Sequence, residues 1–308
     1  MLNFSKEKLL DKLFSGTCLI LLATFLLSFR SILVKFAYTE KIAIMDLFYF
    51  RFLFTIPLLL IFSYSKKGKK LFKLIMNKEI FVSCLLAGFF GYYLATLLDF
   101  HALALIDANI SRIILYSFPI YVLAINHIIK KTLPTVKEII IFIIVQIALF
   151  FVLGGFNFHY SQINKLGALL SLFSAFSYAL YIIINQETGK KIGSILFTTY
   201  AVCFSFIFIN IHYFLSYEPL STTEFTLKSC VIIIVMAIFC TFLPLLLISE
   251  AIKKIGAAKF ALINSLGPVM TIILCYITLN ETLNLSQILG SVIIIITLYL
   301  AATTLKKS

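Results

Sequence analysis

Long apolar runs separated by short polar corners cover the chain from one end to the other. Crossing a hydrocarbon core of about 30 Å takes roughly 20 helical residues, and ten runs come close to that length. They are 16–36, 46–64, 80–99, 106–128, 137–154, 166–185, 195–215, 229–249, 257–278 and 286–304. Lipid offers the backbone no hydrogen bonds, so each run should be a helix rather than an open strand. The pattern therefore predicts an all-α integral membrane protein with ten transmembrane helices.

Two stretches indicate that the chain is duplicated. HALALIDANISRIILYSFP (101–119) and EAIKKIGAAKFALINSLGP (250–268) share an apolar span, a short polar corner and a small-residue helix that meets a proline. The two prolines lie 149 residues apart in a chain of 308. We therefore expect two five-helix repeats, 1–154 and 155–308. With an odd number of spans, the second repeat enters the membrane from the opposite side, an inverted arrangement typical of transporters that work by alternating access.

Composition and charge support a membrane protein and argue against a nucleic-acid partner. Hydrophobic residues make up 61% of the chain and charged residues 13%, while the formal net charge is +13. Most of the 26 lysine and arginine residues fall in alternate polar corners, on the side that also holds both termini. This distribution predicts that both termini are cytoplasmic. The six cysteines lie singly in apolar runs, so we expect no disulfide framework, metal or cofactor.

A set of residues occurs along the chain in the same order as in the drug/metabolite transporter superfamily, and the chain resembles in particular the EamA-type members of that superfamily. They are Pro119, Pro268, Arg51 in FYFRF, and Glu281 and Gly290 in NETLNLSQILGSVII. The resemblance covers essentially the whole chain and implies a ten-span transporter of small metabolites. The chain departs from the family pattern at Thr132, where an acidic residue is usual, and at Thr297 and Leu298, where a second glycine is usual. These departures weaken any expectation of close helix contact in the last span.

The fourth span carries the main candidates for substrate binding. Asn109, Arg112 and Tyr116 lie at steps of three and four, so they share one helical face. Arginine within a membrane span is costly and usually faces a cavity, where its planar fork suits a carboxylate or phosphate. Alternatively, Arg112 snorkels to the outer surface or pairs with Asp107 or Asp99. Pro119, and Pro268 in the other repeat, each remove a backbone donor and should break the helix.

Further candidates come from the other spans. Ser28 and Ser31 belong to a polar stripe of the first span, which either lines a cavity or mediates helix packing. Tyr92 is one of several tyrosines that either stack on a substrate or simply pack. Ser265 occupies the position of Tyr116 in the second repeat, where Ala258 and Ala261 replace Asn109 and Arg112. If the equivalent faces line one cavity, the first repeat should supply the polar side chains that bind the substrate, and the second repeat should supply mostly small, apolar side chains.

These observations predict a secondary transporter for small, amino-acid-like or other carboxylate-bearing metabolites. We expect export across a bacterial cytoplasmic membrane, with the lipid bilayer and a small metabolite as partners; a homodimer stays open. The alternative is uptake of a costly host metabolite such as S-adenosylmethionine. An intramembrane enzyme is disfavoured because GxGD, HExxH and GxSxG are all absent. A receptor would leave the duplication unexplained.

Overall fold

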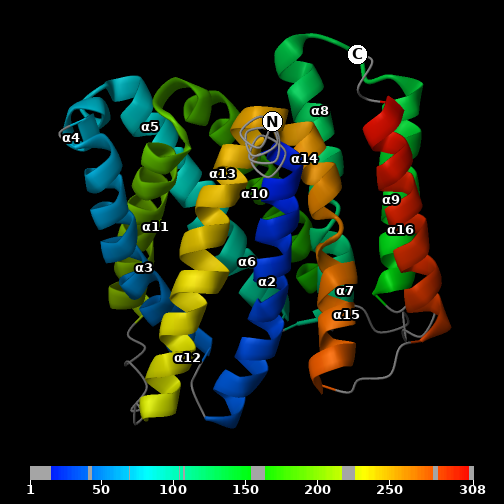
Figure 1. Ribbon diagram of the computed structural model, residues 1–308, viewed down its shortest axis with the longest axis horizontal. Coiled ribbons are helices and arrows are strands. Elements are labelled where there is room, and N and C mark those ends of the chain that lie inside the picture. Colours follow the sequence, from blue (N-terminus) through cyan, green and yellow to red (C-terminus); the bar gives the residue numbers. More distant parts are fainter. Residues whose placement is uncertain are drawn as a thin grey trace, which may run out of the picture. The chain divides into compact units, whose positions relative to one another are not determined.

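The computed structural model describes residues 15–40, 44–68, 70–103, 105–106, 108–153, 164–216, 226–279 and 284–304. Every regular element in these ranges is a helix (Figure 1). Six helical stretches are long and apolar enough to cross a membrane. They are Lys78–Asp99, Ser111–Lys130, Lys165–Ile192, Ser194–His212, Leu227–Ile255 and Ala257–Thr278. Shorter apolar stretches run through Gly16–Arg30 and Leu285–Leu300, so the chain is an all-helical membrane protein.

The helices of the first half of the chain are α2 (Gly16–Thr39), α3 (Ile44–Lys67), α4 (Lys70–Ile75), α5 (Lys78–Ala87), the π-helix η1 (Gly88–Leu94), α6 (Ala95–Leu103), α7 (Ala108–Leu115), α8 (Phe118–Lys130) and α9 (Val136–Val152). Those of the second half are α10 (Lys165–Ile192), α11 (Ser194–Ser216), α12 (Leu227–Ala237), the π-helix η3 (Ile238–Phe242), α13 (Leu243–Ile255), α14 (Ala257–Asn264), α15 (Gly267–Leu279) and α16 (Leu285–Thr304).

The helix bounds recur along the chain. The broken pair α7 and α8 begins and ends 149 residues before the pair α14 and α15. A π-helical segment also stands between α5 and α6, and another between α12 and α13. Pro119 is the second residue of α8, and Pro268 is the second residue of α15. Proline lacks an N–H and its ring clashes with the preceding turn, so a new helix can begin there but the old one cannot continue.

The chain packs as two compact units that cut across the two halves of the sequence. Unit 1 contains residues 1–93 and 184–256, and unit 2 contains residues 94–183 and 257–308. The predicted repeats describe the order of the helices along the chain, whereas the units describe which helices pack together. Each unit therefore combines helices from both predicted repeats.

Unit 1 is built on close contacts between helices of the two halves. Helix α2 packs along α13, and α3 packs against α11 and α12. Gly88, where η1 begins, lies so near α11 that an added Cβ would be 2.5 Å from the carbonyl oxygen of Ala201. Thr55 of α3 donates a hydrogen bond to the carbonyl oxygen of Ala237 at 3.3 Å, next to η3. Gly88 thus admits close backbone approach at η1, and a side-chain hydrogen bond joins α3 to the residue before η3.

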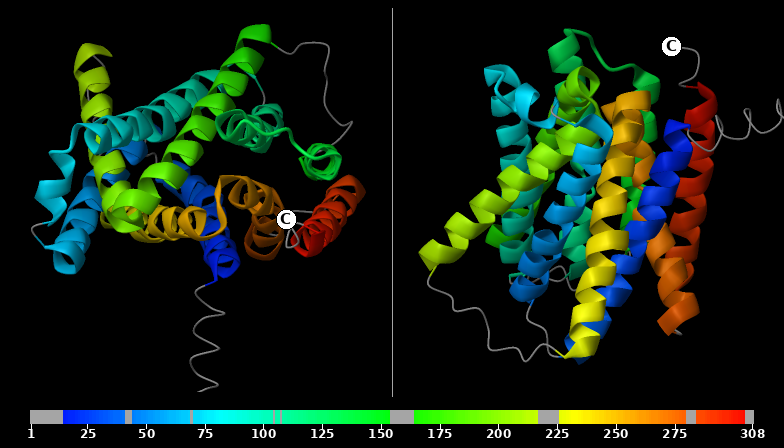
Figure 2. Two further views of the ribbon diagram at one scale, coloured as in Figure 1. Left: turned by 90° about the horizontal axis from the view of Figure 1, so that it is seen from above. Right: turned by 60° about the vertical axis from the view of Figure 1, so that its left-hand side comes forward.

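Unit 2 contains the closest helix pair, α9 and α16, which lie side by side (Figures 1 and 2). An added Cβ on Gly290 would lie 2.6 Å from the carbonyl oxygen of Ala148 and from the amide nitrogen of Val152. Helix α16 therefore makes a close contact through this one glycine, although Thr297 and Leu298 stand where a second glycine is usual. The departures at Thr297 and Leu298 weakened the expectation of close helix contact here, and the contact is present at Gly290. Leu149 and Ile294 are fully buried in the core beside it.

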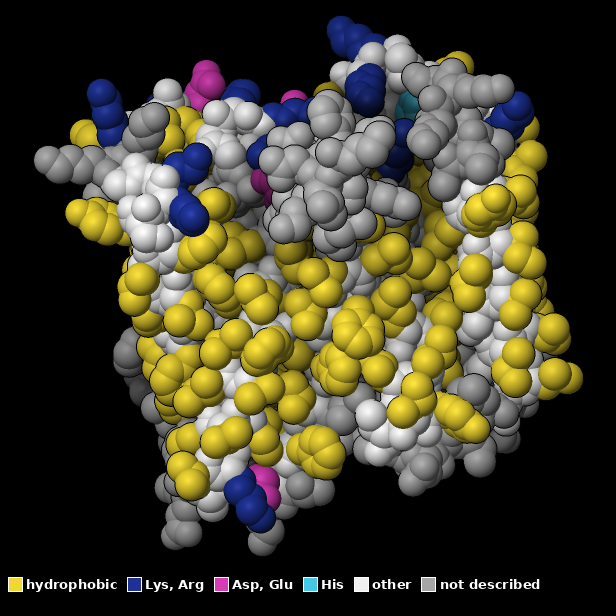
Figure 3. Space-filling view, viewed as in Figure 1, with side chains coloured by type: hydrophobic (Ala, Val, Ile, Leu, Met, Phe, Trp, Pro, Cys, Tyr) yellow, Lys and Arg dark blue, Asp and Glu magenta, His cyan; other side chains and the backbone are white. Residues whose placement is uncertain are grey.

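Many exposed side chains of the helices are apolar, whereas many serine and threonine side chains are buried. Isoleucines of α9 and α16, such as Ile143 and Ile296, are exposed, and hydrophobic side chains cover the middle of the helices on the face in Figure 3. Lysine and arginine side chains on that face gather near helix ends. Several serines and threonines, including Ser171 and Thr55, are fully buried. This distribution suits a lipid environment, in which polar groups must be satisfied inside the protein.

Candidate functional site

The predicted site residues fall in both compact units. Asn109, Arg112, Tyr116 and Ser265 belong to unit 2, whereas Ser28, Ser31 and Tyr92 belong to unit 1. The side chains of Asn109 and Ser31 lie outside the described part of the structure. Among the other five, Arg112 forms an ion pair with a carboxylate of a neighbouring helix.

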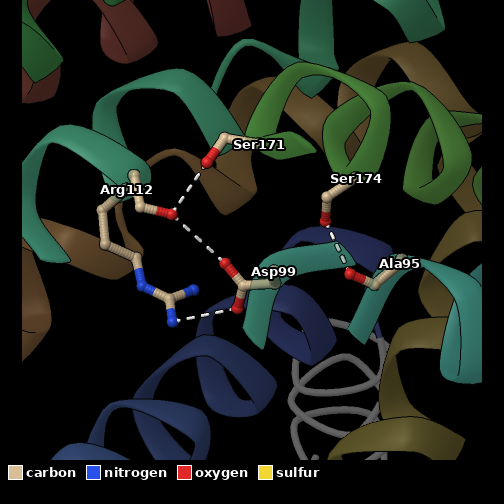
Figure 4. Close-up of polar contacts among 6 residues, drawn as sticks. Ala95, Asp99, Arg112, Ser171 and Ser174 are labelled. Carbon is tan, nitrogen blue, oxygen red and sulfur yellow. Dashed lines mark hydrogen bonds and ion pairs between the residues drawn. The ribbon is translucent and has the colours of Figure 1, made fainter. Parts of the chain in front are cut away.

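Arg112 on α7 forms an ion pair with Asp99 on α6. Its Nη2 donates to Asp99 Oδ2 at 3.1 Å (Figure 4), and α6 and α7 pack against each other. The Arg112 side chain is 38% exposed, whereas that of Asp99 is 11% exposed. Of the two partners that the sequence offered, the structure assigns Asp99; Asp107 lies outside the described residues.

Two buried serines hold the other side of the Asp99 carboxylate. Ser111 Oγ donates to Asp99 Oδ1 at 3.4 Å and shares a 3.0 Å hydrogen bond with Ser171 Oγ of α10. In Figure 4, Ser171 and Asp99 come from two helices and both point toward the same hydroxyl oxygen, while the Arg112 guanidinium meets the other oxygen of the Asp99 carboxylate. One oxygen of Asp99 thus faces a hydroxyl and the other a guanidinium. We call Asp99, Ser111, Arg112 and Ser171 the Asp99–Arg112 cluster.

Helix α10 is fixed against α6 one turn beyond this cluster. Ser174 Oγ donates to the carbonyl oxygen of Ala95 at 2.7 Å (Figure 4). The cluster therefore sits on three helices that hydrogen bonds hold together. The guanidinium group has five N–H donors, and among the described residues only its Nη2 has a hydrogen-bond partner. Arg112 can accordingly accept a second anionic group without leaving Asp99.

Aromatic rings continue from the helix break toward α10. The rings of Tyr116 and Phe118 lie 6.2 Å apart, and Phe118 meets Tyr178 edge to face at 5.1 Å. Tyr178 in turn lies 5.6 Å from Tyr181. Tyr116 and Tyr178 are half-buried, while Tyr181 is fully buried. Tyr116 is thus the predicted site residue that joins the polar face of α7 to an aromatic wall.

The other described candidates make contacts that ordinary packing explains. Ser265 is buried and donates to the carbonyl oxygen of Ala261 at 3.3 Å, within its own helix. Ser28 likewise donates to the carbonyl oxygen of Thr24 at 2.8 Å. Tyr92 is buried on η1, with its ring 6.4 Å from that of Phe52. Their hydroxyl or ring contacts lie inside unit 1 or within one helix.

Ser111, Ser171 and Ser174 belong to the contacts around Arg112, but they were not predicted as site residues. Asp99 was considered only as a partner for Arg112 at the end of a span. A signal for the serines does exist, because Ser171, Ser174 and Ser177 follow one another at steps of three on α10. Such spacing places them along one face of a helix, but it leaves open whether that face packs or binds.

Comparison with known proteins matches two stretches, 14–154 and 165–303, to the EamA-like transporter family. A Bacillus subtilis (strain 168) protein named uncharacterized transporter YcbK is 29% identical over 284 residues, which are 90% of this chain and 89% of the relative. Uncharacterized transporter YvbV of the same organism is 28% identical over 153 residues, 50% of this chain and 49% of the relative. A solved structure titled "Crystal structure of protein" aligns with a TM-score of 0.75 and 14% identity, covering 94% of this chain and 96% of that one. This last likeness concerns the fold.

Proposed function

Because the chain belongs to the EamA-like transporter family, and is thus a membrane transporter rather than an enzyme, we propose that it moves small amino-acid-like metabolites across the bacterial cytoplasmic membrane. The observation that carries the substrate class is the Asp99–Arg112 pair. The Arg112 side chain, which is 38% exposed, offers its guanidinium to a ligand carboxylate, beside the Asp99 carboxylate, which can receive an ammonium group.

Charge balance favours a zwitterion over a simple anion. Asp99 and Arg112 together carry no net charge, so a lone carboxylate at Arg112 would leave one negative charge in excess next to Asp99, which is largely shielded from water. An unpaired buried charge is strongly unfavourable. A ligand with adjacent ammonium and carboxylate groups keeps the cluster neutral and pairs each of its own charges. Bidentate contact between Arg112 and the ligand carboxylate would add geometric selectivity.

The proposed topology is ten transmembrane helices in two inverted five-helix repeats, 1–154 and 155–308. The two matched stretches of the family and the recurrence of the helix bounds every 149 residues support this arrangement. Both termini are placed in the cytoplasm on the basis of lysine distribution. Alternating access then follows from the inverted symmetry. The proposed direction is export, and uptake of a metabolite such as S-adenosylmethionine would use the same amino-acid group.

The test is a thermal-unfolding screen of the purified protein against a metabolite panel. Each amino acid is compared with its methyl ester, which loses the carboxylate charge, and with its N-acetyl derivative, which loses the ammonium charge. A ligand at one hundred times its Kd stabilises the folded state by about 2.7 kcal/mol. We expect stabilisation by the zwitterion only. The ester should fail for lack of a partner for Arg112, and the acetyl derivative for lack of one for Asp99.

Variants tie the result to the cluster. Arg112→Ala should abolish the stabilisation, and Arg112→Lys should weaken it because a point charge replaces the planar fork. Lys228→Ala is the matched control, since Lys228 forms a surface ion pair with Glu40 in unit 1. An unchanged ligand response in correctly folded Arg112→Ala would refute the site. Counterflow of the labelled ligand in liposomes then separates transport from binding, and its sidedness separates export from uptake.

A further inference from the structure

A groove lies between the C-terminal end of α2 and the N-terminal end of α12, which both belong to unit 1. Its volume is about 380 Å³, and its lining residues are Phe36, Glu40, Leu227, Lys228, Val231 and Ile232. In Figure 3 hydrophobic side chains cover α2 and α12 nearly to their lower ends, where side chains of opposite charge lie together. The groove thus opens where the apolar surface of the two helices meets their charged ends.

The greater part of the groove is apolar. Ile232 packs against a buried core that includes Ala37 and Ile233, whereas the side chains of Phe36 and Val231 are 48% and 51% exposed. In a membrane such outward-facing apolar side chains contact acyl chains of the lipid. A groove touches a chain from two sides and therefore makes more dispersion contacts with it than a flat helix face does.

The charged end of the groove presents both signs. Lys228 Nζ lies 3.9 Å from Glu40 Oε1, and the two side chains are 82% and 25% exposed. Thr226 Oγ1 donates to the other carboxylate oxygen of Glu40 at 3.4 Å. The distance between Lys228 and Glu40 is longer than a hydrogen bond, so the N–H donors of the ammonium group can reach an oxygen of a ligand. A cation and an anion side by side suit a ligand headgroup that carries both charges.

We propose that this groove is a binding site for an aminophospholipid of the phosphatidylethanolamine type. One acyl chain lies along Phe36 and Val231, the phosphate accepts hydrogen bonds from Lys228, and the ammonium group donates to Glu40. The quaternary ammonium of phosphatidylcholine has no N–H to donate. Phosphatidylglycerol has no ammonium group, and its negative charge would lie beside Glu40. This inference does not depend on what the protein transports.

The test is native mass spectrometry of the purified full chain with dioleoyl phosphatidylethanolamine, phosphatidylcholine and phosphatidylglycerol, which differ only in their headgroups. We expect phosphatidylethanolamine to bind about threefold to fivefold more tightly than the other two, the effect of one partly exposed charge pair. Glycerophosphoethanolamine, which has the headgroup without acyl chains, should not displace it at equal concentration. Displacement by this soluble compound, or equal binding of the three lipids, would overturn the proposal.

A charge variant tests the headgroup contact. Glu40→Gln keeps an oxygen that can accept from Thr226 but removes the negative charge, so phosphatidylethanolamine should then bind no more tightly than phosphatidylcholine. Glu79→Gln is the matched control, because it removes an equal charge at an exposed position in the first turn of α5, in the same unit. It should leave the preference unchanged. A preference for phosphatidylethanolamine that persists in correctly folded Glu40→Gln would contradict the proposal.

A bulky variant tests the groove itself. Val231→Trp should fill the groove and lower the binding of phosphatidylethanolamine. Ile234→Trp, about one turn farther along α12 at a position that is 42% exposed and outside the groove, is the control and should not lower it. Phosphatidylethanolamine with a diazirine in one acyl chain should label peptides covering 36–40 and 227–232. Labelling only elsewhere, or unchanged binding to Val231→Trp, would place the lipid outside the groove and overturn the proposal.

Discussion

The substitution Gly290→Ala tests the contact between α9 and α16. Helix packing predicts that it lowers the free energy of unfolding, whereas helix propensity predicts that it raises this free energy. In Gly290→Ala the new Cβ would lie 2.6 Å from two backbone atoms of α9 and 2.9 Å from the Cβ of Phe151. Backbone atoms of a packed helix cannot relieve a clash by rotation, as a side chain can, so α9 and α16 must move apart by several tenths of an ångström. Overpacking of this kind costs about 1–3 kcal/mol. Three atoms lie closer than 3.0 Å to the new Cβ, so we expect the upper part of this range, about 2–3 kcal/mol. Alanine is better than glycine inside a helix by about 1 kcal/mol, which leaves a net destabilisation of about 1–2 kcal/mol.

Equilibrium unfolding in mixed micelles of increasing SDS content measures this change in the free energy of unfolding. Ser291→Ala is the matched control, because Ser291 donates only to the carbonyl oxygen of Gln287 in its own helix. It should be nearly neutral. Propensity alone predicts that Gly290→Ala stabilises the protein. Equal or greater stability of that variant would therefore refute the close contact between α9 and α16.

The remaining predictions concern the Asp99–Arg112 ion pair, the turn at Gly256 and the capping box at the start of α9. A double-mutant cycle of Asp99→Ala and Arg112→Ala, measured by SDS unfolding, should give a coupling free energy of about 1 kcal/mol or more, because Asp99 is largely shielded from water. Additive effects of the two substitutions on the free energy of unfolding would count against the ion pair. Gly256→Ala should cost about 1–3 kcal/mol by thermal unfolding, since the backbone there has a φ of 84°; an unchanged midpoint would contradict this strain. Thr135→Ala removes the capping box with Glu138 at the start of α9 and should cost about 1 kcal/mol, with amide exchange in the first turn of α9 as the readout.

Much of the helical layout could be predicted from residues near one another in the sequence. Apolar runs of membrane length predicted helices, because a bilayer imposes that length and leaves the backbone no other partner. Helix ends at 115 and 264 precede Pro119 and Pro268, which lie within two residues of the start of the next helix. Arg112 stood out because a charge is rare and costly in a span. Each of these inferences needs only local chemistry.

The partners of those residues could not be predicted in the same way. Asp99 lies on another helix 13 residues before Arg112, and Ser171 comes from a helix 60 residues beyond Ser111. Gln146 donates to a carbonyl oxygen 30 residues before it. A helical period tells which residues share a face, but it does not tell which faces meet.

The residue pattern alone thus indicates a helical membrane protein with two similar halves, two proline breaks and a candidate arginine. The packing of the helices adds that Arg112 shares Asp99 with buried serines, that Gln146 donates to the Tyr116 carbonyl oxygen, and that each compact unit draws on both halves. Hydrophobicity and periodicity are properties of one helix at a time. Ion pairs, shared hydrogen bonds and close glycine contacts arise between helices, where packing sets the distance.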